Sequence, residues 1–190
     1  MFSLQKDRLK NQGKALATLK EAQVAFPENY TFQKYEVDLL LEMNRKDEAL
    51  SLLTQLAKEQ PNNLSLLVNK ALLLDESYKK NKSQLDSTGL AQALEELITS
   101  YESILSLSPR NPLANFNLAV VYSEKANTYV KALNGMNSSG FALYSDSYQA
   151  KSKEALEKAV SYLEAAKSSQ PKNLNILNDL QLFYEKLGRD

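Results

Sequence analysis

The chain has 190 residues, in which 23 Lys and Arg are balanced by 23 Asp and Glu, and it contains neither His nor Cys. The balanced charge and the absence of a basic cluster argue against nucleic acid and anionic lipid as partners. The missing His and Cys remove the commonest general base, thiol nucleophiles, disulfides and the usual zinc ligands, so we expect neither an enzyme nor a bound cofactor or metal.

The N-terminal residues turn charged within six positions and contain no long apolar stretch. This predicts neither a signal peptide nor a membrane span within the sequence. We therefore expect a soluble protein without membrane insertion, either cytoplasmic or, if an export signal lies outside this sequence, periplasmic.

Four of the five prolines share one local context, in which an apolar-periodic segment ends at the proline and Asn follows two residues later. Proline ends a helix because its ring clashes with the preceding turn and its nitrogen has no proton to donate, and Asn suits the turn into the next helix. Positions twelve, eight and five before each proline fall on one face of a helix and are small or apolar. With their prolines, these residues are Ala15, Leu19, Ala22 and Pro27; Ala49, Leu53, Leu56 and Pro61; Leu97, Tyr101, Ile104 and Pro109; and Ala159, Leu163, Ala166 and Pro171.

A second helix is predicted to open after each proline, and its later copies share an aromatic position. Tyr122 and Tyr184 both fall thirteen residues after their proline, and Pro27 and Pro61 are 34 residues apart. This period, the small-residue face and the aromatic position together resemble the tetratricopeptide repeat (TPR) family. The resemblance implies an all-α, right-handed α-α superhelix, a TPR-like solenoid, of about eight helices.

The helices are expected in a fixed order along the chain. The tail of one helix and a small-face helix reach Phe26, three pairs cover 30–60, 64–108 and 112–170, and a single helix runs from Leu174 to Leu187. Both ends fall within a repeat, so we expect a piece of a longer repeat protein, with a natural short protein as the alternative. The corresponding repeats of the single array 1–190 are 1–27 (partial), 28–61, 62–109 and 110–171 (both with insertions) and 172–190 (a final single helix).

The later prolines are 48 and 62 residues apart, which exceeds the 34-residue period by 14 and 28 residues. The first insertion, at about 77–92, predicts lengthened helices joined by a polar turn. The second, at about 128–153, precedes a small-face helix expected to begin near Ala150. Its aromatic residues either pack on the solenoid or face a partner; they are Phe141, Tyr144 and Tyr148.

In the TPR family the first helix of each pair lines a concave groove that takes extended or helical segments of partner proteins. By register, the resemblance places an apolar lining with acidic edges in this groove, which favours apolar or basic segments. It argues against a co-chaperone that clamps a C-terminal carboxylate with Lys and Arg. The candidate groove residues are Val68, Asn69, Leu72, Asp75, Phe116, Asn117, Val120, Glu124, Asn178 and Leu182.

Each group of groove residues also has a structural interpretation. Val68, Leu72, Phe116 and Val120 are alternatively core side chains. The repeated amides, at Asn69 and at the equivalent position in the next repeat, either hold a ligand backbone or are solvated, and the acidic residues are alternatively a solvated helix face.

The sequence therefore predicts a protein interaction scaffold that binds a peptide or protein segment. The final helix, 174–187, is apolar over more than one stripe, which predicts self-association, a crystal contact or a missing segment at that end. The last repeat also resembles repeat proteins common in Bacteroidetes-type bacteria, many of them exported. An envelope domain that binds glycans or other ligands against aromatic side chains is therefore the alternative, although the ten tyrosines are scattered and Trp is absent.

Overall fold

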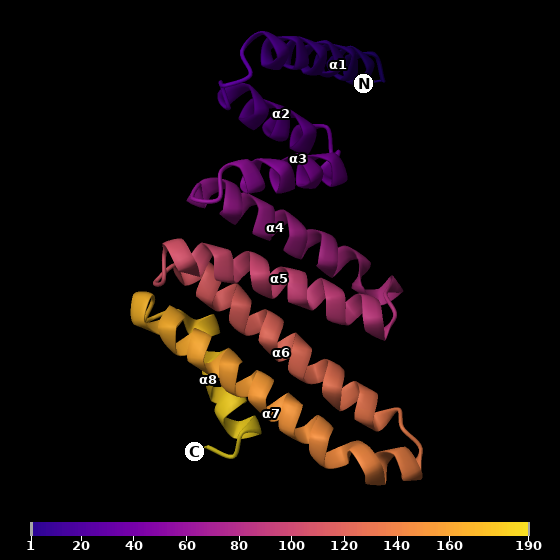
Figure 1. Ribbon diagram of the computed structural model, residues 1–190, viewed down its shortest axis with the longest axis vertical. Helices are drawn as coiled ribbons and strands as arrows, with labels where there is room; N and C mark the ends of the chain where they lie inside the picture. The colour runs from indigo at the N-terminus through magenta and orange to yellow at the C-terminus, as the bar shows by residue number, and fades with distance from the viewer. Residues whose placement is uncertain (1, 190) are drawn as a thin grey trace. The chain divides into compact units, whose positions relative to one another are not determined.

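The computed structural model describes residues 2–189, with side chains described from residue 11 onward. Over these residues the chain forms eight α-helices and a short 3₁₀ turn, Lys82–Gln84, and no strand (Figure 1). The prediction of an all-α fold with about eight helices is confirmed. The helices are α1 (Phe2–Ala25), α2 (Thr31–Glu42), α3 (Lys46–Glu59), α4 (Leu64–Asn81), α5 (Ser87–Leu107), α6 (Pro112–Asn134), α7 (Ser138–Ser169) and α8 (Leu174–Lys186).

Two predicted helix boundaries differ from the structure. Residues 2–25 form one continuous helix, where the tail of one helix and a separate small-face helix were predicted. The helix predicted to begin near Ala150 begins twelve residues earlier, at Ser138, because the Asn137 side chain accepts a hydrogen bond from the Gly140 N–H at 2.8 Å and caps the helix there. The second insertion is therefore mostly helical and lengthens α6 and α7 around a short turn.

The four proline motifs form the same turn each time. The N–H of the Asn two residues after each proline donates to the carbonyl of the residue before that proline, at 3.0, 3.0, 2.9 and 3.1 Å in chain order. Proline occupies the second position of this turn, where its fixed φ is favourable. The turn therefore reverses the chain between consecutive helices.

The same four asparagines also cap the helices that follow. The first backbone N–H groups of a helix have no partner within the helix, and an Asn side-chain oxygen can accept from them. The Asn side chains accept from these backbone N–H groups: Asn29 from Thr31 (3.2 Å), Asn63 from Leu66 (3.3 Å), Asn111 from Ala114 (3.0 Å), and Asn173 from Asn175 (3.1 Å) and Ile176 (3.4 Å). One Asn thus closes the turn with its backbone and starts the next helix with its side chain.

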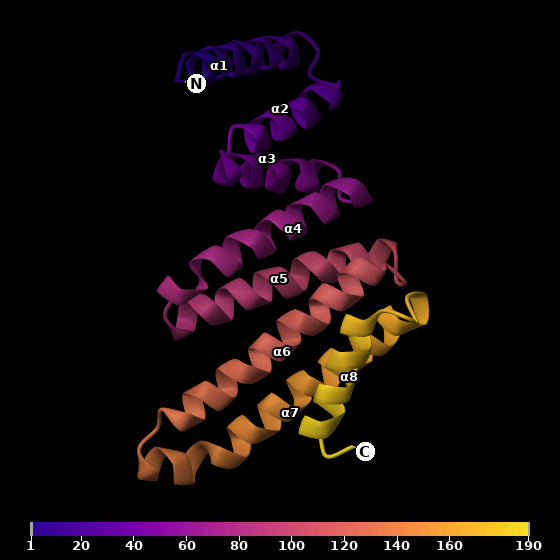
Figure 2. The same cartoon turned by 180° about the vertical axis from the view of Figure 1, so that it is seen from behind.

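The helices form two compact units, one up to Leu73 and one from Leu74 onward. In the first unit α1 packs on α2 and α2 on α3 (Figure 2). The buried face of α1 is shifted by one residue from the prediction, because Leu16 is buried while Ala15 is exposed. The core of this unit consists of Leu16, Val37, Leu40, Ala49, Leu53, Leu56, Leu66 and Leu73.

In the second unit α6 and α7 form a long antiparallel pair, with α5 packed on α6 and α8 packed on α7 (Figures 1 and 2). The predicted small or apolar positions are at the centre of this packing, since all of those in α5 and α7 have no accessible surface. Small side chains at a helix contact allow the two backbones to approach closely. These residues are Leu97, Tyr101, Ile104, Ala159, Leu163 and Ala166.

Candidate functional site

One helix position repeatedly carries a partly exposed apolar side chain. Leu72, Val120 and Leu182 each lie eleven residues after a proline, on α4, α6 and α8, and they are 38%, 38% and 44% exposed. A single exposed Leu is ordinary in a folded protein. The same exposure at one repeat position in three helices is more informative. Leu72 belongs to the first unit, so we call the two residues of the second unit, Val120 and Leu182, the exposed apolar set.

The other predicted groove residues differ in solvent exposure. Asn69 and Asn178 are exposed, and Val68, Phe116 and Asn117 are half-buried. In the second unit the predicted groove residues lie on three helices: Asp75 on α4, Phe116, Asn117, Val120 and Glu124 on α6, and Asn178 and Leu182 on α8. Val68, Asn69 and Leu72 belong to the first unit.

The acidic residues predicted at the groove edge are partly neutralised. Asp75 is only 8% exposed, and its carboxylate accepts a hydrogen bond from the Lys79 Nζ at 2.5 Å. Glu124 is half-buried and pairs with Lys82 at 3.1 Å. Because each carboxylate has a lysine partner, neither offers an unpaired negative charge to a ligand.

These carboxylates lie near buried tyrosines in the second unit. The pKa of Tyr78 is raised to about 12, mainly by burial and then by the nearby charges of Glu124 and Asp75. Burial, followed by the charge of Asp75, also raises the pKa of the fully buried Tyr101. Asp75 therefore belongs to a polar interior, and this position does not behave as the open groove edge that the sequence predicted.

In the first unit, Asn69 lines a cavity of about 430 Å³. The start of α2 contributes Thr31 and Lys34 to its wall, and the turn between α3 and α4 contributes Gln60 and Asn63. The lining is largely polar. Asn69 therefore has polar neighbours, which is compatible both with holding a ligand backbone and with being a solvated amide.

A larger cavity, of about 630 Å³, lies in the second unit. Its wall includes Leu90 and Ala91 of α5, Tyr129 and Ala132 of α6, and Tyr148 of α7. The sequence identified both insertions but did not predict that residues from both would line one cavity. The length of the insertions could have indicated this cavity. Both insertions lengthen a helix pair, and consecutive antiparallel pairs that are both lengthened place their added turns near each other.

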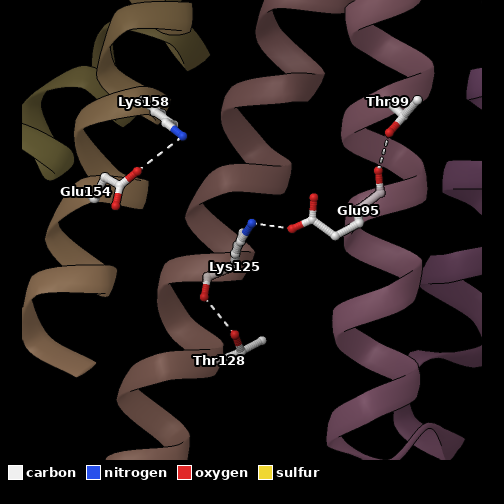
Figure 3. Close-up of polar contacts among 6 residues, drawn as sticks. All are labelled: Glu95, Thr99, Lys125, Thr128, Glu154 and Lys158. Carbon is white, nitrogen blue, oxygen red and sulfur yellow. Dashed lines mark hydrogen bonds and ion pairs between the residues drawn. The ribbon is translucent and has the colours of Figure 1, made fainter. Parts of the chain in front are cut away.

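Charged side chains connect α5, α6 and α7 elsewhere on this unit (Figure 3). Lys125 of α6 pairs with Glu95 of α5, and Lys158 pairs with Glu154 within α7 at 3.2 Å. Both ammonium groups lie over the ring of Tyr122, at 5.9 and 5.5 Å from its centroid. Both carboxylates are engaged in ion pairs with lysines, Glu95 between helices and Glu154 within α7, an arrangement typical of structural stabilisation rather than acid-base chemistry.

Two classes of site receive no support from the described residues. Among the side chains that the structure describes, from residue 11 to residue 189, no group of three or more acidic, His or Cys residues is arranged to hold a metal ion. None of the helices within residues 2–189 has the length and apolarity that crossing a membrane requires.

No family model and no curated protein matches this sequence. Among solved structures, the chain is similar to a MamA RS-1 double mutant (13% identity, TM-score 0.59, 97% of this chain and 81% of that chain). It is also similar to a TPR repeats protein from Bacteroides fragilis (19% identity, TM-score 0.58, 95% and 78%) and to a second MamA structure (14%, TM-score 0.57, 96% and 78%). These similarities confirm the fold: the chain forms a helical-repeat solenoid of the TPR type.

Proposed function

We propose that the chain is a non-catalytic scaffold that binds an extended or helical segment of a partner protein, with the exposed apolar set as its main contacts. The observation that supports this proposal is the repeated partial exposure of Val120 and Leu182. Apolar side chains exposed at the same repeat position of α6 and α8 suit the apolar face of an amphipathic segment. Binding would bury these side chains and gain their hydrophobic free energy.

The partner segment is expected to be apolar, with only a weak preference for basic residues. The sequence alone favoured basic segments, because acidic residues border the groove positions. Asp75 and Glu124 already pair with lysines, so a basic segment would have to compete with these pairs. Apolar contacts therefore contribute more to recognition than charge does.

The test begins with selection of binders from a random displayed peptide library, followed by affinity measurements on the best peptide. Val120→Asp and Leu182→Asp place a charge at the proposed contacts and are expected to weaken binding about tenfold or more. Leu107→Asp is the matched control, because Leu107 is 39% exposed on α5, outside the exposed apolar set, and this variant should bind as the wild type does. Circular dichroism checks that each variant remains helical. Full binding by both Val120→Asp and Leu182→Asp would reject the proposal.

Self-association through α8 is a second candidate, because Leu174 is 71% exposed at the start of this helix. We propose that Leu174 and its neighbour Leu177, which is half-buried, contact a second copy of the chain. Sedimentation velocity over a range of concentrations should then show a reversible dimer that Leu174→Glu abolishes. A concentration-independent monomer would contradict this.

Glycan binding in a bacterial envelope stays a prediction, as does the compartment. Two of the exposed tyrosines belong to different units, Tyr35 on α2 to the first and Tyr144 on α7 to the second. Neither unit therefore carries both of them for stacking against a sugar ring. Saturable binding of oligosaccharides would favour this alternative over peptide recognition.

A further inference from the structure

We infer that the cavity of about 630 Å³ beside the two insertions binds a small amphiphilic anion with an aromatic body and one negative charge. Ligand sites of this kind have volumes of roughly 300–1,000 Å³ and mostly apolar walls with a few polar groups. The inference goes beyond the proposed peptide binding, because the cavity wall includes neither Val120 nor Leu182.

The aromatic part of the wall is held in place by its own contacts. Tyr129 of α6 and Tyr148 of α7 meet edge to face, with centroids 6.0 Å apart and ring planes at 85°. The Tyr144 ring also contacts Tyr148, with centroids 6.4 Å apart, and the Lys151 ammonium lies 5.5 Å from the Tyr148 centroid. Edge-to-face packing fixes the orientation of both rings, so a flat ligand can pack on them without first ordering the wall.

The remaining apolar wall determines the space that a ligand can occupy. Leu90 and Ala91 of α5 form one side, and Ala132 of α6 lies on another. Alanine adds little volume, so the space between α5 and α6 stays open at these positions. A larger side chain at Ala91 or Ala132 would extend into that space.

The charged side chains around the cavity determine which sign of charge on a ligand is favoured. Lys82 and Glu124, which both line it, neutralise each other at 3.1 Å. Lys131 also lines the cavity and is exposed, and no ion pair is found for it among the residues that the structure describes. One uncompensated positive charge favours one negative charge on the ligand, and the hydroxyls of Ser83 and Ser87 can add hydrogen bonds to it.

Two dyes test the class of ligand directly. Anilinonaphthalene sulfonate is an aromatic monoanion, and N-phenylnaphthylamine is its uncharged counterpart; both fluoresce more strongly in an apolar site. Titration of the full chain should show saturable binding of one anilinonaphthalene sulfonate per chain. Ala132→Phe, and separately Ala91→Leu, should weaken both dyes about tenfold or more by filling the cavity.

Lys131→Gln tests the charge. It should weaken the anionic dye about two- to fivefold, as expected for a partly exposed charge pair, and leave the uncharged dye unchanged. Lys167→Gln, at an exposed lysine in the last turn of α7, is the control and should affect neither dye.

The inference is wrong if both cavity-filling variants stay helical by circular dichroism and still bind the dyes normally, or if Lys131→Gln weakens both dyes equally. A peptide selected through the exposed apolar set should not displace the dye. Displacement would overturn the separate site while leaving the proposed peptide binding intact.

Discussion

The ring of Tyr122 on α6 stacks on the ring of Tyr162 on α7, with centroids 5.7 Å apart and planes 14° from parallel. Tyr122 is the aromatic repeat position that the sequence places thirteen residues after Pro109. At the equivalent position in α8, the Tyr184 hydroxyl donates to Glu164 of α7 at 2.6 Å. In both repeats, therefore, the tyrosine thirteen residues after the proline connects its own helix to α7. Tyr122 does so by stacking and Tyr184 by a hydrogen bond.

Tyr122→Ala should lower the free energy of unfolding by about 3–5 kcal/mol, because it removes a nearly buried ring from between α6 and α7. A double-mutant cycle with Tyr162→Ala should give a coupling of about 0.5–1.5 kcal/mol for the stacked pair. Urea unfolding followed by circular dichroism measures both. Strict additivity of the two substitutions would show that the rings contribute only by their separate burial.

Stability should fall in strongly alkaline solution. Burial raises the pKa of Tyr78 and that of Tyr122 to about 12, whereas tyrosine in an unfolded chain titrates near 10. The folded pKa is the higher one, so this stability is complete below about pH 10 and is lost as the pH rises toward 12. The urea midpoint should drop between about pH 10 and about pH 12. Tyr78→Phe should reduce that drop, and an unchanged midpoint in the wild type would contradict the raised pKa values.

The sequence predicts most of the fold because its signals are local. A proline with Asn two residues later specifies a turn and a helix cap through a few neighbouring atoms. This pattern locates the ends of α1, α3, α5 and α7 and the starts of α2, α4, α6 and α8 within a few residues. The start of α7 is missed because the Asn137 cap is a weaker signal than a proline. The burial of Asp75 is missed for another reason: its lysine lies one helical turn away, and only the tertiary packing decides whether that carboxylate faces solvent.

The candidate site is less predictable than the fold. Register alone identifies Val120 and Leu182, because a repeat copies its exposed positions as well as its buried ones. The cavity depends on contacts between residues that are far apart in the sequence, such as Tyr129 and Tyr148 of the second insertion. No periodic pattern relates these residues, so only the packing of α6 and α7 brings them together.

Asn63→Ala should lower the free energy of unfolding of the first unit by about 1 kcal/mol, within a range of about 0.5–2. The reason is that the Asn63 side chain accepts from the Leu66 N–H at 3.3 Å and caps α4. Asn62→Ala is the control, since Asn62 is exposed in the same turn. Hydrogen exchange at the start of α4 reports the cap locally, and equal exchange in the two variants would argue against capping.

Ala159→Leu should destabilise the second unit by about 1–3 kcal/mol, because the added atoms have no room in a contact that leaves Ala159 with no accessible surface. Ala150→Leu adds the same atoms to the same helix at an exposed position and should change the free energy of unfolding by no more than about 0.5 kcal/mol. Thermal and urea unfolding of both variants measure the difference. If Ala159→Leu were as stable as Ala150→Leu, the small residue twelve positions before Pro171 would not be needed for close helix packing, and the physical reason given for this repeat position would fail.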